Sequence, residues 1–287
     1  MSIIREGNEK TPTILDNLYC PYCGKKLIDL EKTVEHVIGR RVVPRYSLEN
    51  SWNLILNCCK KCNNEKSDLE DDISLITQLY SAEDVDTKLE KKARESFSRR
   101  THKKIIDSIE ELNLKVKLQE NVNASFSMFC PPQIDSERAV KLASYYCLAF
   151  FYYLTYNNSK KRGYFFQSFR CINVCEKSDW GNESIMEFQS LVNDWKMIFL
   201  QNTAKQNFKF SFREYNNSTC WAWAVELNQS YRMIGFCGNE DIFIPMLKRF
   251  DSLQNYKLFS KTKDEEIYMR REIPLNQKND LLFKFQE

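Results

Sequence analysis

CPYC (20–23), TVEHVIGRR (33–41) and NSWNLILNCCKKCNNEKSD (50–68) place two Cys-x-x-Cys pairs on either side of one acid–histidine dipeptide. Four thiolates at such spacings predict a tetrahedral structural zinc site formed by Cys20, Cys23, Cys59 and Cys62. The segment between the pairs is longer than the roughly 15–20 residues of common zinc loops, so it must carry structure of its own. Cys58 could pair with Cys62 instead, but Cys59 repeats the spacing of the first pair and is favoured.

The segment between and after the cysteine pairs reads as two strands followed by a helix. Residues 33–38 are β-prone, residues 52–56 form a second apolar run, and a helix is predicted over 60–78 with Asn63 in its first turn. With His36 on the first strand, this order is a ββα arrangement.

The acid and the histidine are neighbours in the sequence, but a regular strand would place their side chains on opposite faces. Alternation places Glu35 on one face and His36 on the other. Both side chains can serve one centre only where the strand bends or ends, and Gly39 permits such a change.

These residues resemble the HNH, or ββα-metal, endonuclease family. Five features follow in the family's order: the first cysteine knuckle, the acid–histidine pair, the central Asn-Leu, the second knuckle and the C-N-x-x-K-S sequence. The resemblance covers about residues 20–68 of the 287-residue chain. It implies a ββα-metal module stabilised by structural Zn²⁺.

The resemblance also implies a role for each matching residue. His36 would be the general base, Glu35 and Asn63 would hold a catalytic Mg²⁺ or Mn²⁺ ion, and Asn53 would orient the loop that holds His36. Lys66 could meet a phosphate. Glu35 stands where the family usually has Asp, and Asn63 replaces the motif's last His. A neutral imidazole suits proton removal from water, and oxygen ligands suit hard divalent cations.

Basic residues near this motif are candidates for contacts with a nucleic-acid backbone. Arg40, Arg41 and Arg45 follow the acid–histidine pair, although arginines on a loop are often merely exposed. Residues 98–104, SRRTHKK, contain no acidic side chain. This second basic segment provides Arg99, Arg100, Lys103 and Lys104, and we assign no catalytic part to His102.

The composition narrows the class of protein. A net charge of +3 is too small to indicate nucleic-acid binding by itself, so that inference depends on local patches. Eleven cysteines, an odd number, fit a reducing compartment better than a disulfide framework. No long uncharged apolar run and no apolar leader is present. We therefore expect a soluble, cytoplasmic protein without a membrane partner.

The expected fold class is α+β, in three parts. Residues 1–80 would form the zinc-stabilised HNH module, 81–130 a basic helical connector, and 131–287 a C-terminal α+β domain for recognition or partner binding, bounded by Pro131-Pro132. Within the last part, the pattern predicts helices over 134–156 and 184–200, strands over 163–174 and 208–213, and a hairpin of 220–227 with 231–236.

The resulting functional prediction is a metal-dependent endonuclease acting on DNA, with bacterial defence or restriction as a context by analogy. A zinc-ribbon module that binds nucleic acid or protein without cutting is one alternative. An RNA-cutting, toxin-like nuclease is another. The C-terminal part could also receive a protein partner or an activator.

Overall fold

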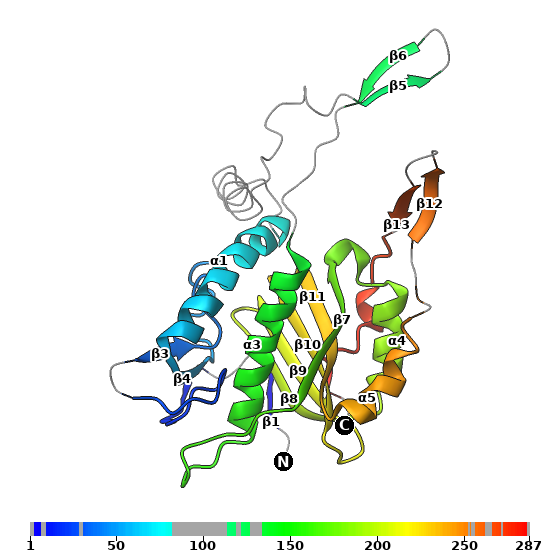
Figure 1. The fold of residues 1–287 in the computed structure, drawn as a ribbon. Coiled ribbons are helices and arrows are strands. Elements are labelled where there is room, and N and C mark those ends of the chain that lie inside the picture. Colours follow the sequence, from blue (N-terminus) through cyan, green and yellow to red (C-terminus); the bar gives the residue numbers. More distant parts are fainter. Residues whose placement is uncertain are drawn as a thin grey trace.

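A computed structural model describes residues 3–6, 10–28, 31–81, 114–118, 122–126, 134–251, 253, 256–261, 266–270 and 272–285 of the chain. These residues form a mixed α+β fold with one six-stranded and one three-stranded sheet, which confirms the expected class (Figure 1). Among them, no helix is both long enough and apolar enough to cross a membrane.

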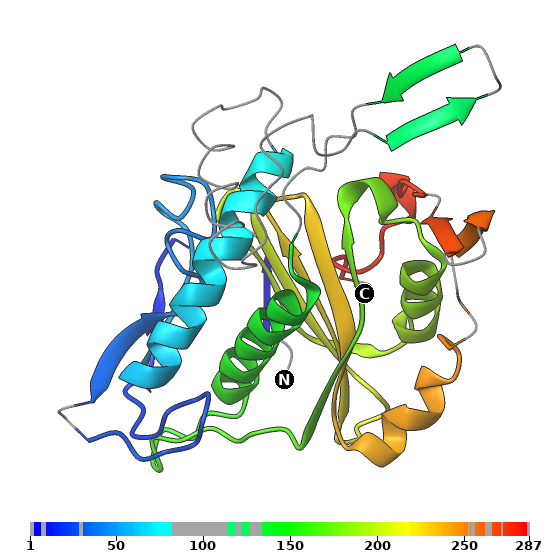
Figure 2. The ribbon, with the colours of Figure 1, turned by 45° about the horizontal axis from the view of Figure 1, so that its top comes forward.

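The larger sheet has the strand order β1-β8-β9-β10-β11-β7, and only β1 and β8 pair in parallel. Helix α3 covers one face, while α4 and α5 lie on the other (Figure 2). The elements are β1 (Ile3–Glu6), β7 (Ser168–Glu176), β8 (Lys196–Thr203), β9 (Phe208–Glu214), β10 (Cys220–Leu227), β11 (Tyr231–Gly238), α3 (Ser136–Leu154), α4 (Glu183–Val192) and α5 (Glu240–Leu247).

The smaller sheet has the order β2-β4-β3 and is followed directly by a helix. Its strands are β2 (Thr13–Ile14), β3 (Lys32–His36) and β4 (Leu54–Cys59), and the helix is α1 (Lys60–Ser81). β3 and β4 are antiparallel, so the chain passes through β3, β4 and α1 in the predicted ββα order.

Helix α3 joins the two sheets into one hydrophobic core. Asp135 caps its start by accepting hydrogen bonds from the backbone N–H groups of Glu137 and Arg138. The Trp52 ring, which precedes β4, lies 6.3 Å from the Phe150 ring on α3 and 6.4 Å from the Phe199 ring on β8. The N-terminal strand β1 also pairs with β8, a contact that the sequence does not predict.

Two predicted elements of the C-terminal part are corrected. The helix predicted over 184–200 ends at Val192, and residues 196–203 form strand β8 instead. Most side chains of this strand are buried, and β1 and β9 pair with it on either side, so tertiary pairing overrides the helical pattern. The strand predicted from Gly163 begins only at Ser168.

The predicted helical connector contains a hairpin. β5 (Leu114–Leu118) and β6 (Val122–Phe126) pair in antiparallel fashion, as the alternating sequence LKVKL favours. A further hairpin joins β12 (Tyr256–Lys261) and β13 (Glu266–Arg270). The basic segment 98–104, with Arg99, Arg100, His102, Lys103 and Lys104, lies outside the described residues, as does Pro131-Pro132.

Candidate metal centre and the adjoining Glu35–His36 site

The four predicted cysteines converge. The sulfur atoms of Cys20, Cys23, Cys59 and Cys62 all lie within 4.8 Å of one another, with Cys23 exposed and the other three buried. This cluster could hold a structural metal such as zinc, because four thiolates are a complete tetrahedral ligand set. Cys58 is not part of the cluster; its Sγ lies 3.4 Å from the Thr33 hydroxyl.

Local backbone geometry places each cysteine pair on a tight turn. In the first knuckle the Gly24 N–H donates to the Cys20 carbonyl at 2.9 Å, and Gly24 adopts φ of +71°, which favours glycine. The second knuckle spans the junction of two elements, because Cys59 ends β4 and Cys62 lies in the first turn of α1. The antiparallel pairing of β3 with β4 therefore fixes the second knuckle within the smaller sheet.

Burial favours the protonated form of two of the four thiols, whereas burial of Cys59 is outweighed by hydrogen bonds from Cys62 and the neighbouring thiols, which lower its pKa. Burial raises the pKa of Cys20 to about 11 and also raises that of Cys62. A metal ion would have to displace these protons, because only a thiolate binds zinc.

Glu35 lies on the buried face of β3 and is already paired. It is 5 % exposed, its Oε1 lies 2.7 Å from the Lys66 Nζ, and the Tyr22 hydroxyl donates to it at 3.3 Å. His36, the next residue, is partly exposed, as alternation along a regular strand requires.

Lys66 lies between two carboxylates, those of Glu35 and Glu70, and only 1 % of it is exposed. Burial lowers its pKa, but the two carboxylates outweigh burial and raise the pKa overall, so Lys66 is a cation at neutral pH. The Tyr146 hydroxyl of α3 donates to Glu70 at 3.4 Å. The sequence interpretation did not include Glu70, although its spacing of four residues from Lys66 on a helix indicates such a pair.

This arrangement gives Lys66 an internal partner, whereas the sequence suggested a phosphate contact. Its ammonium group neutralises the carboxylate that was predicted to bind a catalytic metal ion. Asn63, the other predicted ligand, is partly exposed in the first turn of α1.

The loop after His36 is held by hydrogen bonds with the Asn53 side chain. The Asn53 Oδ1 accepts from the Ile38 N–H at 3.0 Å, and its Nδ2 donates to the Ile38 carbonyl at 2.8 Å. Burial lowers the pKa of His36, and the nearby Arg40 guanidinium lowers it further. The imidazole is therefore largely neutral at pH 7 and can accept a proton.

The three predicted arginines are exposed beside this site. Arg41 forms an ion pair of 3.2 Å with Asp71 on α1, and the Arg45 guanidinium lies 4.7 Å above the Tyr46 ring. The backbone of the same loop is held by the Asn228 side chain, which donates to the Val42 carbonyl at 2.7 Å.

A cavity of about 650 Å³ borders both cysteine knuckles. Cys23, Cys59, Cys62 and Tyr145 are among its lining residues. Four further lining residues are cationic and were not singled out in the sequence: Lys25, Lys26, Lys60 and Lys61. Glu31 and Glu65 also line the cavity, so its lysines and carboxylates give a net charge of +2 (4 − 2), which suits an anionic partner.

Comparison of the chain with models of protein families, with curated proteins and with solved structures gave no match.

Proposed function

We propose that this protein is a zinc-stabilised ββα endonuclease that hydrolyses phosphodiester bonds in DNA, with His36 as the general base. The observation that carries the proposal is the site around His36. The base lies at the end of β3, in front of a loop whose Ile38 backbone is hydrogen-bonded on both sides by Asn53. The cysteine cluster supports the proposal because a metal ion bound there would hold the end of β4 and the start of α1 to the first cysteine pair.

The chemistry follows from the charges around His36. A neutral imidazole takes a proton from the attacking water, which makes the water a better nucleophile. The exposed Arg40, Arg41 and Arg45 side chains supply positive charge for phosphate oxygens. Arg40 would serve twice, since its charge adds to the effect of burial in lowering the pKa of His36.

The resemblance implies a Mg²⁺ or Mn²⁺ ion, and the positions of its two expected ligands show whether they could bind one together. The Glu35 carboxylate is buried and already compensated by Lys66, so the described arrangement does not fit an ion held jointly by Glu35 and Asn63. No step of the proposed mechanism therefore involves such an ion. The metal requirement is instead one arm of the experiment.

The experiment is cleavage of plasmid DNA with Mg²⁺, Mn²⁺ or EDTA, by the wild-type protein and by His36→Ala with the same zinc content. We expect His36→Ala to lose about 10²–10⁴-fold in rate, the usual contribution of a general base. His102→Ala is the matched control, because these are the two histidines of the chain, and it should cut at the wild-type rate. Equal cleavage by His36→Ala would contradict the assignment.

A zinc-bearing module that binds nucleic acid without cutting is the second candidate. It is favoured by the closed Glu35–Lys66 pair and by the lysine-lined cavity at the knuckles. A binder would retard DNA in a gel without cutting it in any metal, and His36→Ala would not alter its affinity. Replacing the plasmid with structured RNA in the same assay distinguishes the RNA-cutting nuclease.

A further inference from the structure

A second cavity, of about 310 Å³, lies on the face of the large sheet that carries α4 and α5. Its lining comes from β8, β9, β10 and β11, the segment after β7, the β8–β9 and β10–β11 turns, and the C-terminal segment. The volume is at the lower end of the roughly 300–1,000 Å³ of small-molecule sites. The cavity therefore has room for a metabolite-sized molecule.

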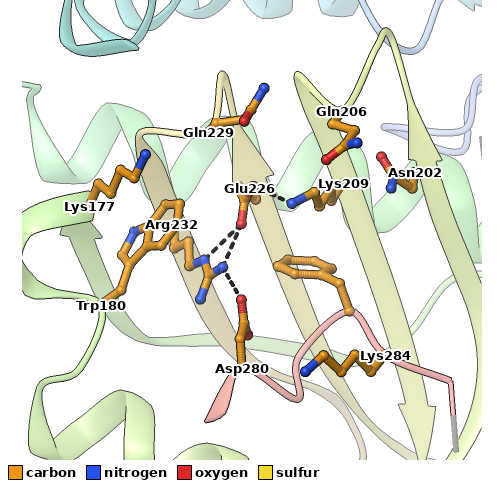
Figure 3. A pocket seen from close by; sticks show the side chains of 11 residues that line it. Lys177, Trp180, Asn202, Gln206, Lys209, Glu226, Gln229, Arg232, Asp280 and Lys284 are labelled. Carbon is orange, nitrogen blue, oxygen red and sulfur yellow. Dashed lines mark hydrogen bonds and ion pairs between the residues drawn. The ribbon is translucent and has the colours of Figure 1, made fainter. Parts of the chain in front are cut away.

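Arg232 is the centre of this cavity and is held rigidly (Figure 3). Its Nε donates to the Glu226 carboxylate at 2.8 Å, its Nη2 pairs with Asp280, and its guanidinium lies 3.6 Å above the Trp180 ring. Lys209 completes the cluster, with its Nζ 2.8 Å from the other Glu226 oxygen. A guanidinium fixed on two sides in this way loses little conformational freedom when it binds a ligand.

Two N–H donors on side chains that line the cavity lack a hydrogen-bond acceptor within the described residues. The Arg232 Nη1 and the Trp180 Nε1 are buried, and neither has a hydrogen-bond acceptor among the residues that the structure describes. Buried N–H groups are nearly always satisfied, because an unpaired one loses its hydrogen bonds to water without replacement. Both side chains line the same cavity, which points to a ligand that brings acceptor oxygens.

The charge of the lining is positive. Four cationic side chains face two carboxylates, which gives a net charge of +2 (4 − 2), and the cations are Lys177, Lys209, Arg232 and Lys284 against Glu226 and Asp280. Lys177 is exposed at the rim, where it can approach a ligand without moving the sheet. The excess positive charge and the leftover donors both select an anion.

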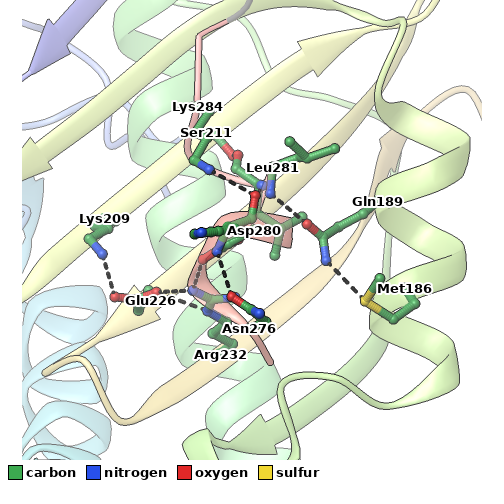
Figure 4. Close-up of polar contacts among 12 residues, drawn as sticks. Met186, Gln189, Lys209, Ser211, Glu226, Arg232, Asn276, Asp280, Leu281 and Lys284 are labelled. Carbon is green, nitrogen blue, oxygen red and sulfur yellow. Dashed lines mark hydrogen bonds and ion pairs between the residues drawn. The ribbon is translucent and has the colours of Figure 1, made fainter. Parts of the chain in front are cut away.

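Anchoring of the C-terminal segment does not account for these features. That segment is already fastened by the Ser211 hydroxyl, which donates to the Leu282 carbonyl at 3.1 Å, and by the Leu281 N–H, which donates to Gln189 at 2.7 Å (Figure 4). Neither bond involves Trp180 or the Arg232 Nη1.

We propose that this cavity binds a small phosphate-bearing molecule, with its phosphate oxygens accepting hydrogen bonds from Arg232 and Trp180 and an ion pair from Lys177. The site is independent of the proposed nuclease activity. It is nevertheless next to the N-terminal module, because Gln229 lines it and the flanking residues Asn228 and Ser230 donate to Thr77 on α1.

The test is isothermal titration calorimetry on the full zinc-loaded chain, with inorganic phosphate, adenosine monophosphate and succinate as probes. We expect binding of at least one of the two phosphate probes and none of succinate. Trp180→Phe keeps the ring beneath Arg232 but removes the N–H donor, and Lys177→Gln removes one rim charge. Each should weaken binding by about tenfold or more. Lys196→Gln, at an exposed lysine of β8 outside the cavity, is the matched control and should bind as the wild type does.

Three results would overturn the proposal: no binding of either phosphate probe, binding of succinate with equal affinity, or unchanged affinity in both Trp180→Phe and Lys177→Gln. Melting temperatures of the variants show whether each is folded. Because heat of binding is measured and not cleavage, failure here leaves the nuclease proposal untouched.

Discussion

Two buried cations, each between two carboxylates, mark the two halves of this protein. In the N-terminal module Lys66 lies between Glu35 and Glu70, and in the large sheet Arg232 lies between Glu226 and Asp280. The first cluster is closed by the hydroxyl groups of tyrosines from both halves of the chain. The second borders a cavity, and one N–H group of its arginine has no acceptor within the described part of the chain.

The difference shows how surroundings decide the role of a buried charge. Lys66 offers three donors in a compact group, and the adjacent carboxylates engage it inside the fold. Arg232 offers five donors in a planar fork, more than its two acidic neighbours satisfy. The lysine cluster therefore serves stability, whereas the arginine cluster can also bind a ligand.

The largest expected effect is the unfolding of the N-terminal module, which would leave only the arginine cluster intact. Cys59→Ala should abolish zinc binding and unfold this module, since apparent zinc-binding free energies of about 10–16 kcal/mol are also folding free energies. Zinc content measured by mass spectrometry, together with circular dichroism, tests this. Cys58→Ala is the matched control, because Cys58 lies outside the cluster and its loss should leave zinc bound. Loss of zinc from Cys58→Ala instead would contradict the ligand set.

Lys66→Met should cost about 3–5 kcal/mol of unfolding free energy, because two buried carboxylates lose their shared cation. Urea denaturation of zinc-loaded protein measures this loss. Lys61→Met, at an exposed lysine of the same helix, should change the value by about 0.5 kcal/mol or less. If the two variants were equally stable, the lysine cluster would not be the closed structural element described above.

Arg232→Met should cost less unfolding free energy than Lys66→Met, about 1–3 kcal/mol. This difference would separate the arginine cluster from the lysine cluster. Glu226 keeps Lys209 as a partner, and 21 % of the Asp280 side chain is exposed to water. The same denaturation experiment measures the loss, with Arg170→Met at an exposed ion pair as the control. A loss larger than that of Lys66→Met would reverse the ranking of the two clusters.

The smallest effect concerns the pH dependence of cleavage. Burial and the Arg40 charge lower the pKa of His36, so the wild-type rate should stay constant down to a pH below about 6.5 and then fall as the imidazole is protonated. Arg40→Gln removes one cause, so this fall should move to higher pH. Arg45→Gln is the control and should leave the midpoint unchanged. A wild-type midpoint above 6.5 would contradict the electrostatics of the site.

Much of the N-terminal module could be predicted from sequence, because its determinants are local. Repeated Cys-x-x-Cys spacing identified all four cysteines of the cluster, and alternation along residues 33–38 placed Glu35 and His36 on opposite faces of β3. The internal role of Lys66 was missed, since it depends on how α1 packs against β3 and on Tyr146 from α3.

Long-range packing limited the prediction elsewhere. The sequence predicts a helix over residues 196–200. Nothing within these residues indicates that β9, which follows later in the chain, pairs with them as a strand. The Arg232 cavity draws Lys177, Lys209, Glu226 and Asp280 from four separate segments, so no sequence window contains it. The single core around Trp52 and Phe150 likewise joins residues about a hundred positions apart.

The central claim is that His36 is the base of a phosphodiester-cleaving site. Its most direct test is the single-turnover cleavage rate of labelled DNA by wild type and His36→Ala, with equal zinc content in each preparation. The account predicts cutting by the wild type and a loss of about 10²–10⁴-fold in the variant. Equal rates, or a zinc-loaded wild type that binds DNA but cuts neither DNA nor RNA in any metal, would contradict it.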